Sequence, residues 1–255
     1  MANVISNRLE VKGDEQQIQK MFQFIATGNP DDETYQVIDF TKIIPMPDTL
    51  KIEDGSITAD AYCYFLELNQ GNNQKTNILD SYLSKNYLSR LSVSSRSKAY
   101  KAQYSEQELL KLKEMGEIYV SNIKEYGYPT WYEWRCKNWG TKWPAYNDSY
   151  SKGNAIYFQT ANGNCLRVIS KLHEMFNSLT FFYQYADEDI GNNVGEFILP
   201  AHTSDIKSLL VEESSSEAYR IYLEASDIGV NGCESIRLNS KGEFELVDEE
   251  DESEE

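Results

Sequence analysis

The 255-residue sequence predicts an α+β fold, and three observations indicate it. A strand-like segment near the amino terminus is followed by a helical pattern and a second strand-like segment. The same order recurs after residue 154, and a long stretch of helical spacing at residues 59–126 separates the two patterns. Two β-α-β units split by an insertion suggest a ferredoxin-like sheet with helices over one face.

The first β-α-β pattern occupies residues 1–47. Residues 7–13 alternate between polar and apolar side chains, as a half-buried strand does. Asp14 and Gln17 have the spacing of a capping box, which predicts the start of a helix. Residues 34–47 are rich in β-branched and aromatic side chains and reach two prolines, so we expect a second strand there.

The insertion is expected to be helical. Residues 61–68 and 77–91 have helical spacing, and Ser105 with Glu108 forms a second capping box. The helix that follows carries a buried stripe at Leu112, Met115, Tyr119 and Ile123. We place the whole insertion at about residues 59–146.

The second β-α-β pattern and the C-terminal region complete the prediction. The expected elements are a strand at 154–161, a helix at 164–176, a strand at 179–187, a strand at 194–200, helices at 204–213 and 216–226, and a hairpin at 234–247 around Lys241 and Gly242. The domain organisation is then a ferredoxin-like domain over 1–197, an extension packed on it over 198–247, and a disordered acidic tail over 248–255.

Charge and composition limit the class of protein. The net charge is −17, and residues 248–255 contribute seven of these charges. Such a field repels phosphate and argues against general nucleic-acid binding. The amino terminus lacks the pattern of a signal peptide, and no run approaches the roughly 18 apolar residues of a membrane span. The four widely spaced cysteines fit reduced thiols, so we expect a cytoplasmic protein with no membrane contact. These cysteines are Cys63, Cys136, Cys165 and Cys233.

One stretch is basic within this acidic chain. Residues 72–104 carry a local charge of +5 with interleaved tyrosines. The stretch could bind a phosphate backbone, or it could be a solvated helix that faces the acidic body of the same chain. The candidate basic patch comprises Lys85, Arg90, Arg96, Lys98 and Lys101.

All four tryptophans lie within residues 130–146. Thr130 with Glu133 is expected to cap a short helix over 131–139, which Gly140 ends in a left-handed conformation. One interpretation buries these rings as core. The other makes them a stacking platform with nearby cations, and its candidate binding residues are Trp131, Trp134, Arg135, Trp139, Lys142 and Trp143.

Two segments carry a family resemblance: residues 138–146, "NWGTKWPAY", and an N-terminal strand pattern at Asn3, Asn7, Arg8, Leu9, Val11 and Gly13. They resemble the signature and the first strand of a family of phage and plasmid proteins described as YubB-like, with a ferredoxin-like domain. Residues 40–47, 156–161 and 179–197 resemble further parts of the family. Where the family often has a tryptophan and prolines after the "F-x-T-A" strand, this chain has Asn162, Gly163 and Asn164. The resemblance implies a mobile-element accessory protein in a bacterial host, and no particular activity.

Catalytic and metal-binding patterns have weak support. His173 lies on the apolar side of a helix and His202 follows a proline, so neither suggests a catalytic triad. The acidic run 187–193 lacks the terminal glutamate of an EF-hand, and a solvated turn explains it. No phosphate-binding glycine motif is present. We expect no enzyme, no catalytic residue, no metal site and no cofactor.

The leading hypothesis is a non-enzymatic accessory protein that binds a host or defence protein, as an acidic inhibitor or nucleic-acid mimic. The alternative is a small-ligand or nucleotide-binding protein that uses the tryptophan-rich region, for which a nucleotide should quench tryptophan fluorescence. An enzyme that uses acids such as Asp187 and Asp189 is the third hypothesis. The sequence indicates no oligomeric state.

Overall fold

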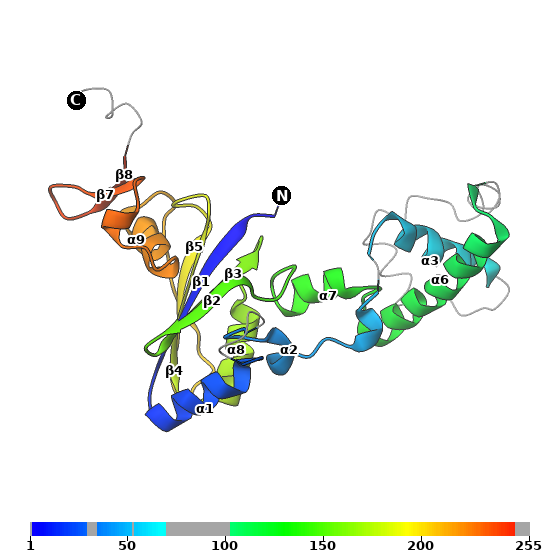
Figure 1. The fold of residues 1–255 in the computed structure, drawn as a ribbon, viewed down its shortest axis with the longest axis horizontal. Helices are drawn as coiled ribbons and strands as arrows, with labels where there is room; N and C mark the ends of the chain where they lie inside the picture. Colours follow the sequence, from blue (N-terminus) through cyan, green and yellow to red (C-terminus); the bar gives the residue numbers. More distant parts are fainter. Residues whose placement is uncertain (1, 30–34, 53, 70–102, 248–255) are drawn as a thin grey trace. The chain divides into compact units, whose positions relative to one another are not determined.

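The computed structural model describes residues 2–29, 35–52, 54–69 and 103–247 (Figure 1). The chain forms two compact units. Unit 1 comprises residues 1–45 and 136–255, and unit 2 comprises residues 46–135. The candidate basic patch of Lys85, Arg90, Arg96, Lys98 and Lys101, the predicted helix at 77–91 and the acidic tail lie outside the described residues.

Unit 1 is built on a six-stranded sheet in which all neighbouring strands are antiparallel. The strand order is β2-β3-β1-β4-β5-β6. The strands are β1 (Val4–Lys12), β2 (Tyr146–Lys152), β3 (Ala155–Ala161), β4 (Thr180–Asp187), β5 (Val194–Leu199) and β6 (Lys207–Leu209). Because β3 and β4 both run antiparallel to β1, they are parallel to each other, and α8 (Leu166–Met175) connects them.

The two faces of this sheet carry different helices. Along β1 the buried positions alternate with half-exposed ones, as expected for a strand with two distinct faces. Tyr183 on β4 contacts the start of α8, whereas the next residue, Gln184, contacts α9 (Ser216–Ala225). The helices α8 and α9 therefore lie on opposite sides of the sheet (Figure 1). The α8 side also carries α1 (Glu15–Ile25) and α2 (Phe40–Ile43).

Most of the locally encoded elements are confirmed. Asp14 caps α1 by accepting a hydrogen bond from the Gln17 backbone at 3.0 Å. The predicted strands at 154–161, 179–187 and 194–200 correspond to β3, β4 and β5, and the predicted helices at 164–176 and 216–226 correspond to α8 and α9. The C-terminal hairpin pairs β7 (Ile236–Leu238) with β8 (Phe244–Leu246) around a turn at Gly242.

Two predicted elements are wrong. Over the described residues 35–47, the predicted strand is replaced by an isolated bridge and the short helix α2. Asp39 caps α2 by accepting from the Thr41 backbone at 2.8 Å, and Phe40 and Ile43 bury one side of the turn. This capping signal outweighed the β-branched composition. The predicted helix at 204–213 is instead the edge strand β6, because its backbone pairs with β5.

The strand β2 was missed by the sequence analysis. Its sequence, "YNDSYSK", is poor in β-branched side chains and contains three residue types that favour turns. Long-range pairing with β3 holds it in the sheet, with an irregularity between Tyr146 and Tyr150. Tertiary pairing therefore decided this element.

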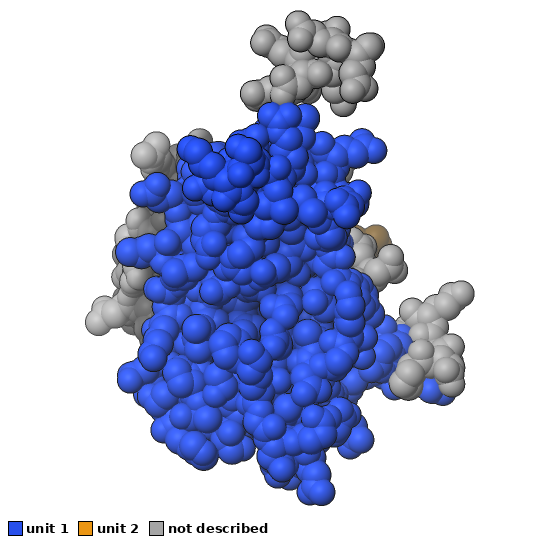
Figure 2. Space-filling model, turned by 90° about the vertical axis from the view of Figure 1, so that its left-hand side faces the viewer, with its two compact units in different colours: residues 1–45, 136–255 blue, residues 46–135 orange. Residues whose placement is uncertain are grey.

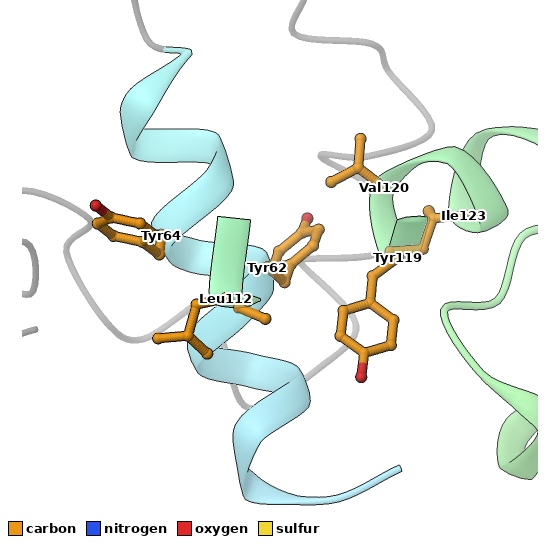
Figure 3. Close-up of a cluster of buried hydrophobic side chains, with 7 residues drawn as sticks. Tyr62, Tyr64, Leu112, Tyr119, Val120 and Ile123 are labelled. Carbon is orange, nitrogen blue, oxygen red and sulfur yellow. The ribbon is translucent and has the colours of Figure 1, made fainter. Parts of the chain in front are cut away.

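Unit 2 contains η1 (Asp48–Leu50), α3 (Ser56–Leu68) and α6 (Glu106–Tyr126) among its described residues. The predicted capping box is confirmed, since Ser105 and Glu108 bond each other reciprocally at the start of α6. The helices α3 and α6 pack through a cluster of apolar side chains (Figure 3): Ala61, Tyr62, Tyr64, Leu112, Tyr119, Val120 and Ile123. Asn122 on α6 ties in the flanking chain by donating to the Thr49 and Pro129 carbonyls at 2.9 and 3.0 Å.

The helix α7 (Trp131–Asn138) crosses the division between the units and closely matches the prediction for 131–139. Its predicted cap is wrong, because the Thr130 hydroxyl oxygen is buried without a hydrogen-bond partner among the described residues. Gly140 follows at φ +86°, as predicted, and a Cβ there would lie 2.5 Å from the Asn164 carbonyl oxygen. Only glycine fits this turn without a shift of the backbone. Within the ranges described above, no helix has the length and apolar character to cross a bilayer.

Candidate functional site

The tryptophans do not form one described cluster, because they are divided between the two units. In unit 2, Trp134 is buried, and Trp131 is half-buried with the Arg135 guanidinium carbon 4.9 Å from its ring centroid. Burial lowers the pKa of Arg135. This cation–π pair is internal to the chain.

In unit 1, Trp139 and Trp143 have different environments. Trp139 is fully buried, meets Phe40 edge-on with ring centroids 5.7 Å apart, and donates from Nε1 to the Ile44 carbonyl at 3.0 Å. It is a core residue with its polar atom paired. Trp143 is 39% exposed, with Lys142 Nζ 5.0 Å from its ring centroid and Tyr146 edge-on. Of the two rings, only Trp143 is open to a ligand.

Unit 1 contains a groove of about 650 Å³ beside α9. We call it the α9 groove. Figure 2 shows unit 1 from the side on which α9 and the hairpin lie. Its apolar lining comprises Leu223, Ile228, Val230, Leu238 and Phe244, with the backbone of Gly229. Its polar lining comprises Arg8, Glu10, Lys152, Tyr157, Arg220, Glu224 and Asp227. The volume lies in the range of about 300–1,000 Å³ that is usual for ligand sites.

The apolar wall of the α9 groove comes mainly from α9 and the hairpin. Residues opposite each other in the hairpin share a face, so Leu238 and Phe244 point to the same side as Ile236. Ile236 is buried against Tyr219 and Leu223, with Phe244 packed beside them. Leu238, however, is 49% exposed. The helix therefore covers only part of this apolar face, and the remainder opens into the groove.

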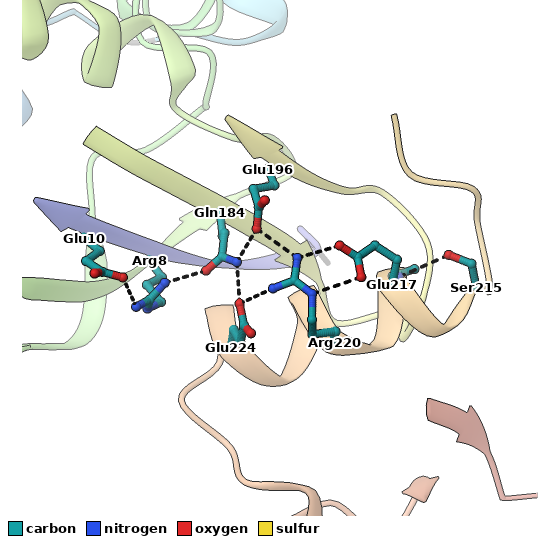
Figure 4. Close-up of polar contacts among 9 residues, drawn as sticks. Arg8, Glu10, Gln184, Glu196, Ser215, Glu217, Arg220 and Glu224 are labelled. Atoms are coloured by element: carbon teal, nitrogen blue, oxygen red, sulfur yellow. Dashed lines mark hydrogen bonds and ion pairs between the residues drawn. The ribbon is translucent and has the colours of Figure 1, made fainter. Parts of the chain in front are cut away.

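The polar wall is a continuous chain of hydrogen bonds across the sheet (Figure 4). Arg8 on β1 donates to Glu10 at 2.5 Å, to Tyr157 at 3.2 Å and to Gln184 at 2.8 Å. Gln184 then donates to Glu196 at 2.7 Å and to Glu224 on α9 at 2.5 Å. The chain of bonds fixes α9 to the centre of the sheet.

Arg220 on α9 is the hub at the other end of this network (Figure 4). Its guanidinium contacts Glu217 at 2.7 Å, Glu196 at 2.9 Å and Glu224 at 2.5 Å. The bond from Arg220 lowers the pKa of Glu217, and the three carboxylates together raise the pKa of Arg220. Both bonds to Glu224 fall on Oε2, so Oε1 accepts none from the described residues. That oxygen is available to a donor that enters the groove.

A second set of contacts ties the chain after α9 to β2. Asp227 accepts from Lys152 at 2.8 and 3.0 Å and from the Tyr150 hydroxyl at 3.0 Å. Asp227 has φ +52°, and Tyr150 stacks on Tyr157 with centroids 5.1 Å apart. The bond from Lys152 lowers the pKa of Asp227, while burial and the bond to Asp227 raise the pKa of Tyr150 to about 12. These contacts form a latch at one end of the groove.

The variant Asp227→Asn is expected to weaken this latch in a pH-dependent way. The folded pKa of Asp227 lies below its ordinary 3.8, so the ion pair stabilises the fold at neutral pH and is lost as the pH falls through the folded value. Asparagine tolerates the same left-handed backbone. In urea unfolding we expect a loss of up to about 1 kcal/mol at pH 7, and a smaller loss at a pH below the folded pKa of Asp227. An equal loss at both pH values would contradict the electrostatic origin.

Other titratable groups of unit 1 serve internal contacts. Tyr183 donates to Asn7 Oδ1 at 2.6 Å and accepts from the Cys165 backbone at 3.0 Å, and burial raises the pKa of the Cys165 thiol to about 12. Asp187 accepts from Asn193 Nδ2 at 2.9 Å and from the Asp189 backbone at 3.1 Å. These bonds hold strand ends and turns.

The side chains that could bind a metal are dispersed across the part of the chain that the structure describes. There, no three His, Cys, Asp or Glu side chains meet in an arrangement for a metal ion. His173 is buried on α8, with its ring edge-on to Phe181 at 5.1 Å between centroids.

Comparisons with known proteins identify neither a family nor a function for this chain. No family model and no curated protein matches the sequence. The chain is similar to one solved structure, the crystal structure of a protein api92 from Yersinia pseudotuberculosis, which is described by the family model DUF1281. That alignment covers 83% of this chain and 99% of the other, at 10% sequence identity and a TM-score of 0.37. A likeness of this size supports neither a fold nor a function.

The α9 groove was not foreseen from the sequence. Arg8 and Gln184 are 176 residues apart, and Lys152 and Asp227 are 75 apart. One signal was present, because the hairpin was predicted and its apolar residues alternate with Arg237 and Glu245. Such a two-stranded ribbon must cover its apolar face with something.

Proposed function

We propose that this chain is a non-enzymatic binding protein that engages another protein through the α9 groove. The partner would be a host or defence protein, and the chain a mobile-element accessory protein acting in the cytoplasm of a bacterial host. The proposed mobile-element origin and host partner rest on the YubB-like sequence resemblance. The proposed binding role rests on the α9 groove.

The observation that carries the proposal is the half-covered hairpin. Leu238 is 49% exposed on the apolar face of the hairpin, next to buried apolar neighbours. A partner side chain could complete this packing, while the open oxygen of Glu224 could accept a hydrogen bond. An apolar wall beside a few oriented polar groups is typical of binding sites.

The charged groups of the groove support binding rather than acid–base chemistry. Burial disfavours the charge of Glu10, but hydrogen bonds from Arg8 and Lys12 outweigh it and lower the Glu10 pKa. The pKa of Asp227 is also lowered, by Lys152, and that of Tyr150 is raised to about 12. Groups whose pKa lies near neutral pH serve best as general acids and bases. The shifts described here move the pKa values of these groups further from neutral pH.

We also propose that unit 1 is a ferredoxin-like domain extended at one edge. The order β2-β3-β1-β4, with α8 linking the two strands that flank β1, supports this assignment. The strands β5 and β6, with α9 and the hairpin, would then be additions. The groove lies between these additions and the proposed domain.

The test is affinity capture from a nuclease-treated lysate of the bacterial host, with a matched pair of variants. Leu238→Glu places a charge in the groove at a position that is 49% exposed, and Leu110→Glu places the same charge on α6, where Leu110 is 60% exposed. We expect wild type and Leu110→Glu to capture one protein stoichiometrically, and Leu238→Glu to lose it by at least about tenfold, as a charge opposite an apolar hot spot does.

Capture that survives Leu238→Glu would contradict the groove as the site. Removing residues 248–255 separates the acidic tail from this effect: capture that persists without the tail would exclude the tail from any nucleic-acid mimicry. Loss of capture at high salt would support an electrostatic contribution.

A further inference from the structure

The cations that line the α9 groove are already paired with acids of the same chain. Arg8 forms an ion pair with Glu10. Lys152 forms one with Asp227, and Arg220 contacts three carboxylates. An anionic ligand would have to displace one of these carboxylates and would lose the bonds that it makes. The groove is therefore poorly suited to a ligand that brings a carboxylate or a phosphate.

The carboxylates of the groove, in contrast, have capacity to spare. The single positive charge of Arg220 faces three negative charges, which leaves a local excess of two negative charges. Of these three acids, Glu224 lines the groove, and its side chain is 40% exposed. The net charge of −17 also attracts cations to this chain. The groove therefore favours a cation that donates a hydrogen bond.

The bonds already made by Glu224 select the kind of cation. Its Oε2 accepts from Gln184 and from Arg220, whereas Oε1 accepts from none of the described residues. Each carboxylate oxygen offers about two lone pairs, so Oε2 is already filled. An arginine fork engages both oxygens of a carboxylate, but a lysine ammonium is a point charge that can donate to one oxygen. The geometry of Glu224 therefore favours lysine.

The apolar wall of the groove suits the rest of a lysine side chain. Leu223, Ile228 and Val230 line the same groove as Glu224. Lysine buries its methylene stem along apolar surface while its ammonium reaches a polar group. Leu238, which is 49% exposed, leaves apolar surface for a second side chain next to the lysine.

We propose that the α9 groove recognises a lysine of its protein partner, with the ammonium on Glu224 Oε1 and an adjacent large apolar residue against Leu238. This inference rests on the proposed binding role of the groove and names the chemistry that the groove recognises. Acetylation of the lysine removes its charge. An acetylated partner should therefore bind the groove more weakly.

A blocked tripeptide, acetyl-Leu-Lys-Leu-amide, is the probe for a titration of the full chain followed by NMR of the backbone amides. We expect shifts confined to α9 and to the hairpin strands β7 and β8, with a dissociation constant on the order of 1 mM. The same peptide with an acetylated lysine should bind about tenfold more weakly or worse, because it loses a hydrogen bond between charged groups. The peptide with arginine in place of lysine should bind more weakly as well.

A matched pair of variants assigns the preference to Glu224. Glu224→Gln removes the charge in the groove and should abolish the difference between the lysine and acetyl-lysine peptides. Glu174→Gln is the control, because it removes the same charge from α8 on the opposite side of the sheet, where Glu174 pairs with Lys171 at 2.7 Å. This control should keep the tenfold preference. The comparison of the two peptides on the wild-type chain decides the proposal even where Glu224→Gln does not fold.

Equal affinities of the lysine and acetyl-lysine peptides for wild type would overturn the lysine contact and leave the groove as a binding site. Tighter binding of the arginine peptide would overturn it too, as would a folded Glu224→Gln that keeps the preference, or an absence of shifts in α9 and the hairpin. The proposed function fails by a different result, namely capture that survives Leu238→Glu. The two failures are therefore distinguishable.

Discussion

Replacing Trp139 by alanine is expected to destabilise unit 1 by about 3–5 kcal/mol, the usual cost of truncating a large buried aromatic side chain. The ring is fully buried against Phe40, and its Nε1 donates to the Ile44 carbonyl at 3.0 Å. The variant would leave both a cavity and an unpaired carbonyl. Because domains are stable by only about 5–15 kcal/mol, this loss is a large share of the total.

Urea unfolding followed by far-UV circular dichroism measures this effect without relying on tryptophan fluorescence. Trp143→Ala is the matched control, since Trp143 is 39% exposed and close along the chain. We expect a loss below about 1 kcal/mol for the control, as for other exposed side chains. Equal losses for the two variants would show that Trp139 is not the core residue described above.

The second large effect is expected in unit 2, at Gly116→Ala. Alanine normally favours a helix over glycine by about 1 kcal/mol. Here the added Cβ would lie 2.2 Å from the Ala61 carbonyl oxygen and 2.5 Å from the Phe65 Cβ, both on α3. One of these contacts is with backbone, so α3 has to move away from α6. We expect a destabilisation of about 1–3 kcal/mol or more, the usual cost of overpacking.

Hydrogen exchange measured peptide by peptide localises this effect. Amides in α3 and α6 should exchange faster in Gly116→Ala, whereas those of β1 and β4 serve as an internal reference. Gly55→Ala is the control in the same unit, because a Cβ there meets nothing within 4 Å. Slower exchange of α3 and α6 in Gly116→Ala would mean that helix propensity, not close packing, decides this position.

The elements that sequence reasoning predicted correctly share a short range of interaction. Asp14 caps α1 three residues away, Ser105 and Glu108 form their box over three residues, and Gly242 turns the hairpin between adjacent strands. Each signal involves backbone groups only a few positions apart. Such signals can be recognised in a single amino-acid sequence.

The elements that were predicted wrongly or missed depend on pairing between segments that are distant in the sequence. Residues 35–47 have a strand-like composition, yet none of the described strands pairs with them as a ladder, and Asp39 starts a helical turn instead. The strand β2 has a turn-like composition and is held in the sheet by β3. Strand formation depends on a partner, which composition does not supply.

The candidate sites also combine features that the sequence showed with features that only the structure shows. The tryptophan-rich segment was visible as a concentration of rings, but only the structure separates the buried Trp134 and Trp139 from the exposed Trp143. The α9 groove draws its groups from β1, β2, β3, α9 and the hairpin. Its polar wall depends on pairs such as Arg8 with Gln184, which are 176 residues apart.

The amino-acid sequence alone therefore determined the α+β class, most helices, the hairpin and the acidic charge, because caps, periodicity and composition act over a few residues or over the whole chain. The tertiary structure decided the strand order, the two units and the groove. Those features arise from contacts between distant segments, and their free energy appears only once the segments meet.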